Sequence, residues 1–353
     1  MSALLLIWSA SVVLAAVALI WMSSLVVARV LREGGENRRR HDMRLIQQAF
    51  LDIMSGSGDA VGRLRDVKGR ARLMAEALLE VIALVRGGER ERLISALTAF
   101  RVDDIFCRRL SLGSIAGRVV AAEALSVFPG ERTCVALRRA LRRARVGELR
   151  VGLMRSLIEI GAPPALREVL ADLGGRRASD SLLYLPLIAR LVADDPMTAL
   201  KAFGDPQVTG EARVILAEAL GASGDYRMLQ PLCIAARAPD VELRIAAIRG
   251  LAALGHPAAE PTILAGLADG VWVVRAASCE AAGRIGLRSA MPQLEAQLDD
   301  PVWWVRFRAG EALAGLGQEG QDRLRARAAF GGDLSRRTAS MVLAERGLAV
   351  EAV

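Results

Sequence analysis

Histidine and cysteine, the residue types that most often carry catalysis or bind metals, are sparse in this sequence. The 353 residues include only two histidines, His41 and His256, and no Cys-x-x-Cys pair. The four cysteines are Cys107, Cys134, Cys233 and Cys279. Their wide separation favours free thiols in a reducing compartment over a structural zinc site. No serine-hydrolase, phosphate-loop, dinucleotide or zinc-protease motif occurs. The sequence therefore indicates a protein that is not an enzyme and that needs no cofactor or metal.

Aromatic and arginine side chains offer the chemistry of binding instead. Trp272 comes first in the chain, and Trp303, Trp304, Phe307 and Arg308 follow it as a close group. Tryptophan, tyrosine and arginine supply much of the binding energy at protein interfaces. These residues predict a surface that contacts a partner protein. The alternative is that the tryptophans pack between neighbouring structural units, because large apolar side chains are often partly buried.

Trp272 and Trp303 are 31 residues apart, and this distance is the period of a sequence repeat. Arg244, Arg275 and Arg306 recur at the same interval, and each is followed, eleven residues later, by a glycine. These glycines are Gly255, Gly286 and Gly317. A fixed period in this range, with two helices in each unit, is typical of a helical solenoid. The composition agrees, because the chain is 53% hydrophobic but only 4% aromatic, as expected for stacked helices rich in alanine and leucine.

Each repeat is predicted to form two antiparallel helices. The glycine ends the second helix, because glycine enters the left-handed region at little cost. In the following repeat, an aspartate such as Asp269 or Asp300 is expected to cap the start of the second helix. Apolar and small residues recur inside it at helical spacing, and they predict the face that packs against neighbouring helices. They are Leu243, Ala247, Leu251 and Leu254, then Val274, Ser278, Ala282 and Ile285, then Val305, Ala309, Leu313 and Leu316.

The repeat can be followed outward from residues 240–317. Counting by the same interval predicts another unit that ends at Gly224 and a shortened last unit that ends at Gly347. The solenoid is therefore expected over residues 105–353. Residues 42–104 also show helical patterns and are expected to be a helical cap or degenerate repeats at its N-terminal end.

The repeated phrase resembles the HEAT repeats first recognised in phycobilisome lyases. The resemblance is carried by residues 240–317, and it implies an all-α fold, a right-handed α-solenoid of helix pairs with a concave binding surface. It also implies that positions around the arginine face this concave groove. In this sequence the residues concerned are Trp272, Trp303, Trp304, Phe307, Arg308, Arg249, Glu280 and Glu311.

The resemblance further implies a ladder of aspartate and arginine between repeats. Asp269 lies six residues before Arg275, and Asp300 lies six residues before Arg306. The repeat of Arg244 has Ala238 in the aspartate position, so the ladder is expected to be interrupted there. These charged residues are predicted to be structural, because charged groups inside a protein are kept only when they are paired.

An uncharged segment at the N-terminus predicts a membrane anchor. Residues 3–28 carry no charge and are long enough, as one helix, to cross a bilayer about 30 Å thick. A cleaved signal peptide is the rival interpretation, but no basic residue precedes the apolar run. We therefore expect one transmembrane helix within residues 1–29 and a basic linker over residues 30–41. The anchor includes Leu4, Trp8, Trp21 and Val27.

The arginines after the apolar segment predict its orientation. Positive charge collects on the cytoplasmic side of a bacterial inner membrane, so the N-terminus is expected outside and the repeats in the cytoplasm. The arginines that determine this topology are Arg29, Arg32, Arg38, Arg39 and Arg40.

Together these features predict a membrane-anchored scaffold that binds another protein. Resemblance to bacterial membrane-bound HEAT-repeat proteins suggests a membrane glycosyltransferase of envelope polysaccharide synthesis as the partner. One alternative is a lyase-like enzyme that acts on a small molecule in the concave groove. A second alternative is nucleic-acid binding by the arginine-rich segment 138–145, although that segment has no interleaved aromatic residues.

Overall fold

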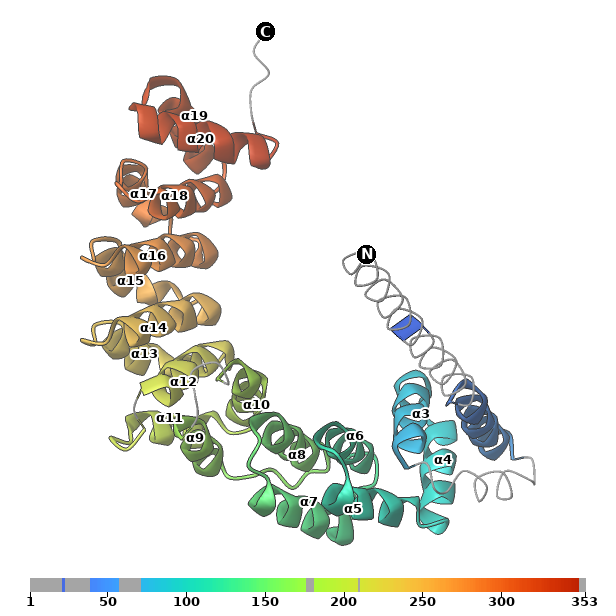
Figure 1. Cartoon of the computed structure of the whole chain (residues 1–353). Coiled ribbons are helices and arrows are strands. Elements are labelled where there is room, and N and C mark those ends of the chain that lie inside the picture. Colours follow the sequence, from blue (N-terminus) through green and yellow to red (C-terminus); the bar gives the residue numbers. More distant parts are fainter. Residues whose placement is uncertain (1–20, 23–38, 57–70, 176–180, 209, 349–353) are drawn as a thin grey trace, which may run out of the picture. The chain divides into compact units, whose positions relative to one another are not determined.

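The computed structural model describes residues 21–22, 39–56, 71–175, 181–208 and 210–348, and within these ranges it contains helices and no strand. The chain forms two compact units, Met1–Pro163 and Pro164–Val353. In both units each helix packs against helices close to it in sequence, as in an α-solenoid. The predicted all-α class is therefore confirmed (Figure 1).

The first unit consists of a helix over residues 39–55 followed by helices α3 to α8. Their bounds are α3 Ala71–Leu84, α4 Gly88–Ala99, α5 Val102–Leu112, α6 Ile115–Leu125, α7 Glu131–Arg143 and α8 Gly147–Glu159. Helix α3 contacts both α5 and α6. These contacts cross the boundary that the sequence suggested between residues 104 and 105, so residues 71–104 belong to the same compact unit as α5 to α8.

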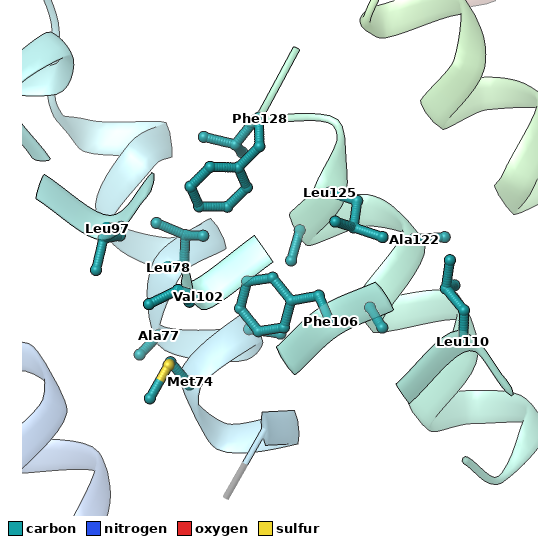
Figure 2. Close-up of a cluster of buried hydrophobic side chains, with 14 of the residues drawn as sticks. Met74, Ala77, Leu78, Leu97, Val102, Phe106, Leu110, Ala122, Leu125 and Phe128 are labelled. Carbon is teal, nitrogen blue, oxygen red and sulfur yellow. The ribbon is translucent and has the colours of Figure 1, made fainter. Parts of the chain in front are cut away.

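Aliphatic residues and two phenylalanines form the core of the first unit. Phe106 of α5 lies close to Phe128 with 6.2 Å between the ring centroids, and both are buried. Met74, Ala77 and Leu78 of α3 reach the same core, as Figure 2 shows. The face of α3 that carries these three residues therefore points inward. Burial of such side chains contributes about 1.5–3 kcal/mol each for the larger ones.

The helix over residues 39–55 is tied to α3 by polar contacts as well as by its apolar face. Arg39 and Arg72 both donate to the carboxylate of Glu76, at 2.7 and 2.8 Å. Burial alone would raise the pKa of Glu76, but the hydrogen bonds from the two arginines outweigh it and lower that pKa. Gln47 adds a hydrogen bond to Glu80 at 3.1 Å.

The second unit is a two-layer stack of helix pairs. Helices α12, α14, α16, α18 and α20 pack side by side in one layer, and α13, α15, α17 and α19 belong to the other. The bounds are α9 Leu166–Gly174, α10 Ser181–Asp194, α11 Pro196–Gly204, α12 Gly210–Ala222, α13 Leu229–Ala235, α14 Val241–Leu254, α15 Glu260–Leu267, α16 Trp272–Ile285, α17 Met291–Gln297, α18 Trp303–Gly315, α19 Gln318–Phe330 and α20 Asp333–Glu345.

The predicted helix ends are confirmed at the repeated glycines. Gly255 and Gly286 end α14 and α16 in the left-handed region, with φ of 68° and 83°. Gly224, Gly317 and Gly347 also have positive φ. A single-turn 3₁₀ helix then follows at the same period, at Tyr226–Met228, Pro257–Ala259 and Arg288–Ala290.

Small residues let the helices of one layer approach closely. A Cβ added to Gly250 would lie 2.8 Å from the Ala217 carbonyl oxygen, and one added to Gly221 would lie 2.2 Å from the backbone of Gly250. The predicted packing face is buried as expected, including Ala247, Ser278 and Ala309. Ile285 is the exception, since it is only partly buried.

The predicted anchor lies largely outside the described residues. Leu4, Trp8 and Val27 are not among them, nor are Arg29, Arg32 and Arg38. Trp21 is described, and it is helical and exposed. Among the helices that are described, none combines the length and the apolar content required to cross a bilayer.

Candidate functional site

Arginine and aspartate link consecutive repeats of the second unit. Arg244 contacts Asp269 of the following repeat, with 3.1 Å between Nε and Oδ2. Arg275 contacts Asp300 in the same way, at 2.7 Å from Nε to Oδ2 and 3.2 Å from Nη2 to Oδ1. Both pairs are largely buried. The two-point geometry matches the planar guanidinium to the carboxylate and stabilises the interface between repeats.

Each arginine also binds the backbone of its own repeat. Nη1 of Arg275 donates to the carbonyl oxygens of Asp269 and Gly270, at 2.9 and 3.3 Å. The aspartate carboxylates accept a backbone N–H two residues later, as Asp269 does from Val271 at 2.8 Å. The aspartates therefore organise the turn before α16 and α18, whose N-cap residues are Val271 and Val302. The expectation that these two aspartates are themselves the N-caps is wrong, because both helices begin later in the chain.

The aspartate–arginine ladder is interrupted at a different arginine from the one predicted from the sequence. Arg244 has both a backbone contact, to the carbonyl oxygen of Ala238, and a carboxylate contact, to Asp269. The residue that loses its aspartate is Arg213, since Ala238 lies 25 residues after it, as Asp269 does after Arg244. The guanidinium of Arg213 instead lies 5.3 Å from the ring centroid of Phe203.

Three of the predicted aromatic residues, Trp303, Trp304 and Phe307, form a surface cluster on α18, and Trp272 is exposed at the equivalent position of α16. We call Trp272, Trp303, Trp304 and Phe307 the aromatic stripe. The ring of Trp303 stacks on that of Phe307 with 5.1 Å between centroids, and Trp304 meets Trp303 edge to face at 4.7 Å. Trp272, Trp303 and Trp304 are 41%, 40% and 49% exposed. These fractions favour a surface role over packing between repeats.

The predicted charged residues lie in a row across successive helices. Glu218, Arg249, Glu280 and Glu311 follow one another at the repeat interval, on α12, α14, α16 and α18. Arg249 pairs with Glu218 at 3.3 Å, and the structure thus adds Glu218 to the predicted set. Subtracting one period from Arg249 would have found it in the sequence.

Arg308 connects this row to the aromatic stripe. It contacts Glu311 at 2.8 Å and Glu280 at 3.7 Å. One face of α18 carries residues 303, 304, 307, 308 and 311, because residues three or four apart in a helix lie on the same side. Arg346 approaches Glu311 at 3.3 Å, and these charged side chains line a shallow hollow of about 260 Å³. The exposed face of the second unit thus combines aromatic rings with both signs of charge.

A basic groove lies on the first unit, between α5, α6 and α7. Its volume is about 760 Å³, and its lining includes five arginines. They are Arg108, Arg118, Arg132, Arg139 and Arg143. Arg132 contacts Asp104 at 3.2 Å, and this aspartate is the one acidic residue in the described lining. The sequence singled out residues 138–145 but not Arg108 and Arg118, which the fold brings beside them.

Two of the four thiols, those of Cys107 and Cys279, are poor nucleophiles. Burial, together with Asp103 and Asp104, raises the pKa of Cys107 to about 11. Burial also raises the pKa of Cys279. Across the described ranges, no group of three or more histidine, cysteine, aspartate or glutamate side chains is arranged to hold a metal ion.

Of the two predicted topology arginines in the described ranges, Arg39 is engaged in structure. It forms the ion pair with Glu76 and is 58% exposed in its side chain. Arg40 lines a shallow surface depression beside it, together with Met43 and Arg44.

Part of the second unit is similar to a known repeat family. A family model described as HEAT repeats matches residues 229–314. Among solved structures, human deoxyhypusine hydroxylase in complex with glycerol is similar at 17% identity, over 88% of this chain and 97% of that chain, with a TM-score of 0.30. A search of curated proteins gives no match.

Proposed function

We propose that this HEAT-repeat protein is a scaffold that binds another protein through the aromatic stripe. The observation that carries the proposal is the exposure of three tryptophans on two successive repeats, next to Phe307. Tryptophan contributes strongly to binding when a partner covers it. An exposed group of large aromatic residues on a helical scaffold is typical of an interaction surface.

The charged row gives the surface its selectivity. Arg308 and Glu311 share a helix face with the aromatic residues, and Arg249 and Glu280 extend the row across α14 and α16. A partner that presents apolar side chains for the stripe and matching charges for the row binds in one orientation. Charge complementarity of this kind suppresses wrong partners and fixes the register of the interface.

We further propose that the scaffold is tethered to the bacterial inner membrane with its repeats in the cytoplasm. The uncharged segment of residues 3–28 and the arginines that follow it support this placement. A scaffold held beside the bilayer meets membrane enzymes first. The resemblance to bacterial membrane-bound HEAT-repeat proteins suggests which one, so the proposed partner is a membrane glycosyltransferase of envelope polysaccharide synthesis.

Affinity capture from detergent-solubilised membranes tests the proposal. The wild-type protein is compared with Trp303→Ala and Trp304→Ala, and captured proteins are identified by mass spectrometry. We expect a stoichiometric membrane glycosyltransferase with the wild type. Each substitution is expected to reduce its binding by roughly 2 kcal/mol, or about 30-fold in Kd.

Phe330→Ala is the matched control, because Phe330 is a 91% exposed aromatic residue outside the stripe. It should capture the partner as well as the wild type does. Circular dichroism confirms that each variant retains its helices. Equal capture by all variants, or no stoichiometric glycosyltransferase in any of them, would contradict the proposal.

Nucleic-acid binding is a second candidate, and the basic groove favours it. Four of its five arginines have no acidic partner in the described part of the chain, so they are available to phosphate groups. Binding to single-stranded or double-stranded DNA is then expected to weaken steeply with salt. Arg139→Glu should reduce that binding and the salt dependence, as measured by fluorescence anisotropy. Binding that is absent at low salt would exclude this candidate.

A further inference from the structure

At Arg213 the ladder of arginines lacks its carboxylate. Arg244 and Arg275 each contact an aspartate 25 residues later, in the next repeat. The corresponding residue for Arg213 is Ala238, whose methyl group offers no acceptor. At Arg244 and Arg275 the aspartate fills the space beside the guanidinium and holds the following turn.

An open cavity lies at this position. Its volume is about 1070 Å³, and it lies between α11, α12, α13, α14 and α15 of the second unit. Arg213 and Ala238 both line it, and so does Phe203, the ring on which Arg213 rests. The missing aspartate therefore coincides with space that a ligand can enter.

Two arginines line the cavity against one acidic side chain, so its described lining is net positive. Arg213 is half-buried, and its Nε has no hydrogen-bond acceptor. Arg237 also lines the cavity, and it has no ion pair within the described ranges. Asp240 is the single acidic residue in the described lining, and its carboxylate accepts the backbone N–H of Glu242 at 3.0 Å as the N-cap of α14.

We propose that this cavity binds a carboxylate side chain of an acidic peptide segment in a partner protein. The carboxylate takes the place beside Arg213 that Asp269 and Asp300 take beside Arg244 and Arg275. A guanidinium on an aromatic face keeps its edge free for such a two-point contact. The site is separate from the proposed function, because it shares no residue with the aromatic stripe.

The apolar part of the lining favours a peptide over a free small acid. Ile234 is 73% exposed, and Pro231 and Pro261 lie in the same lining. An apolar residue next to the acidic one in a peptide covers these side chains and excludes water from the ion pair. A small dicarboxylate provides the charge but leaves the apolar lining exposed.

Substitution of Ala238 tests the site directly. In Ala238→Asp the protein supplies its own carboxylate, so the substitution completes the ladder and blocks the ligand. The probe is a fluorescein-labelled peptide of alternating leucine and glutamate, measured by anisotropy with the full chain. We expect Ala238→Asp and Arg213→Gln to weaken binding at least about tenfold, since hydrogen bonds to charged groups contribute strongly. Ala238→Asp is also expected to raise Tm.

Ala238→Asn is the matched control, because it has the size of aspartate but no charge, and it should bind the acidic peptide more tightly than Ala238→Asp does. Cys233 lines the cavity, so bound peptide should slow its alkylation in the wild type. The proposal is overturned if the probe does not bind, if a glutamine peptide binds as well, or if Ala238→Asp binds like the wild type. Glutarate binding as tightly as the peptide would contradict a peptide ligand. Capture through the aromatic stripe should be unchanged in Ala238→Asp, so the two proposals fail independently.

Discussion

Arg306 is the last arginine of the ladder, and it has no aspartate partner in the following repeat. It is only 6% exposed, and Gly331 takes the place in the following repeat that an aspartate takes for Arg275. Its Nη1 donates to the carbonyl oxygens of Asp300 and Pro301, at 2.7 and 3.0 Å, and its Nε donates to the hydroxyl of Thr338 at 3.4 Å. Arg306 thus keeps the backbone contacts of the other ladder arginines, and the hydroxyl of Thr338 takes the place of the carboxylate.

Loss of a ladder carboxylate should destabilise the second unit. Asp300 accepts two hydrogen bonds from Arg275 and one from the backbone N–H of Val302. Asp300→Ala leaves a largely buried guanidinium without its partner, and we expect a loss of about 3 kcal/mol in the free energy of unfolding. Urea denaturation measures it.

Asp300→Asn separates the two roles of this side chain. The amide can still accept the Val302 N–H, but it carries no charge, so we expect an intermediate loss. If both variants unfold at the wild-type urea concentration, the ladder is not a source of stability.

The reactivity of Cys107 should follow its raised pKa. A thiol pKa of about 11, against an ordinary value of 9.0, leaves about 100-fold less thiolate at pH 8. Iodoacetamide should therefore modify Cys107 slowly at pH 8 and faster as the pH approaches 11, as followed by peptide mass spectrometry. Unfolding in urea should remove the protection. Fast modification of the folded protein at pH 8 would show that the thiol is not shielded.

At the level of helices, the close approach of α12 and α14 depends on glycine. Gly250 faces the Ala217 carbonyl oxygen and Gly221 faces Gly250, with no space for a side chain on either. The same region of the repeat holds Gly283, where a Cβ would lie 2.9 Å from the backbone of Ala312. The spacing between repeats is therefore set by residues without side chains.

Gly250→Ala should destabilise the repeat interface even though alanine favours helices. The added methyl group would lie 2.8 Å from a backbone oxygen and forces α12 and α14 apart, so we expect a cost of about 3 kcal/mol, which exceeds the gain of about 1 kcal/mol in helix propensity. Gly315→Ala is the control, because a Cβ there meets nothing within 4 Å. The control should leave Tm unchanged or raise it. A Gly250→Ala protein as stable as the control would refute this account of the interface.

Much of the second unit follows from the repeat period, because each interval repeats the same local chemistry. Helix ends at Gly255 and Gly286 could be predicted, since a left-handed residue there requires glycine. The carboxylate partner of Arg275 could not be predicted from the sequence. Asp269 lies six residues before it and Asp300 lies 25 residues after it, and these two intervals sum to one period. Only the stacking of the repeats shows that the side chain pairs forward.

The site was predictable to a similar degree. Exposure of Trp303 and Trp304 could not be decided from the sequence, because the same residues at the start of a helix can also pack between repeats. The basic groove depends on Arg108 and Arg139, which lie on two helices whose separation is known only from the fold. The cavity beside Arg213 required knowledge of which arginine lacks its aspartate.

A membrane tether would determine how the whole protein behaves when membranes are separated from the soluble fraction. The full chain should sediment with membranes and resist extraction at high salt, because the tether is apolar. A chain that starts after residue 38 should be found in the soluble fraction with its helices intact. Protease added to inverted inner-membrane vesicles should digest the repeats. Repeats protected in inverted vesicles, or a full chain released by salt, would contradict the proposed topology.

The forward pairing of arginine with aspartate gives the array a direction, and this determines how it can grow. A second set of residues 270–300, inserted directly after Asp300, spans one full period and brings its own Arg275 and Asp300 equivalents. Every guanidinium at both new junctions then meets a carboxylate. The protein should accept such a duplication and lengthen by one helix pair. A duplication that ends at Ala238 would instead create another vacant position, and with it a further place for an outside acid to enter.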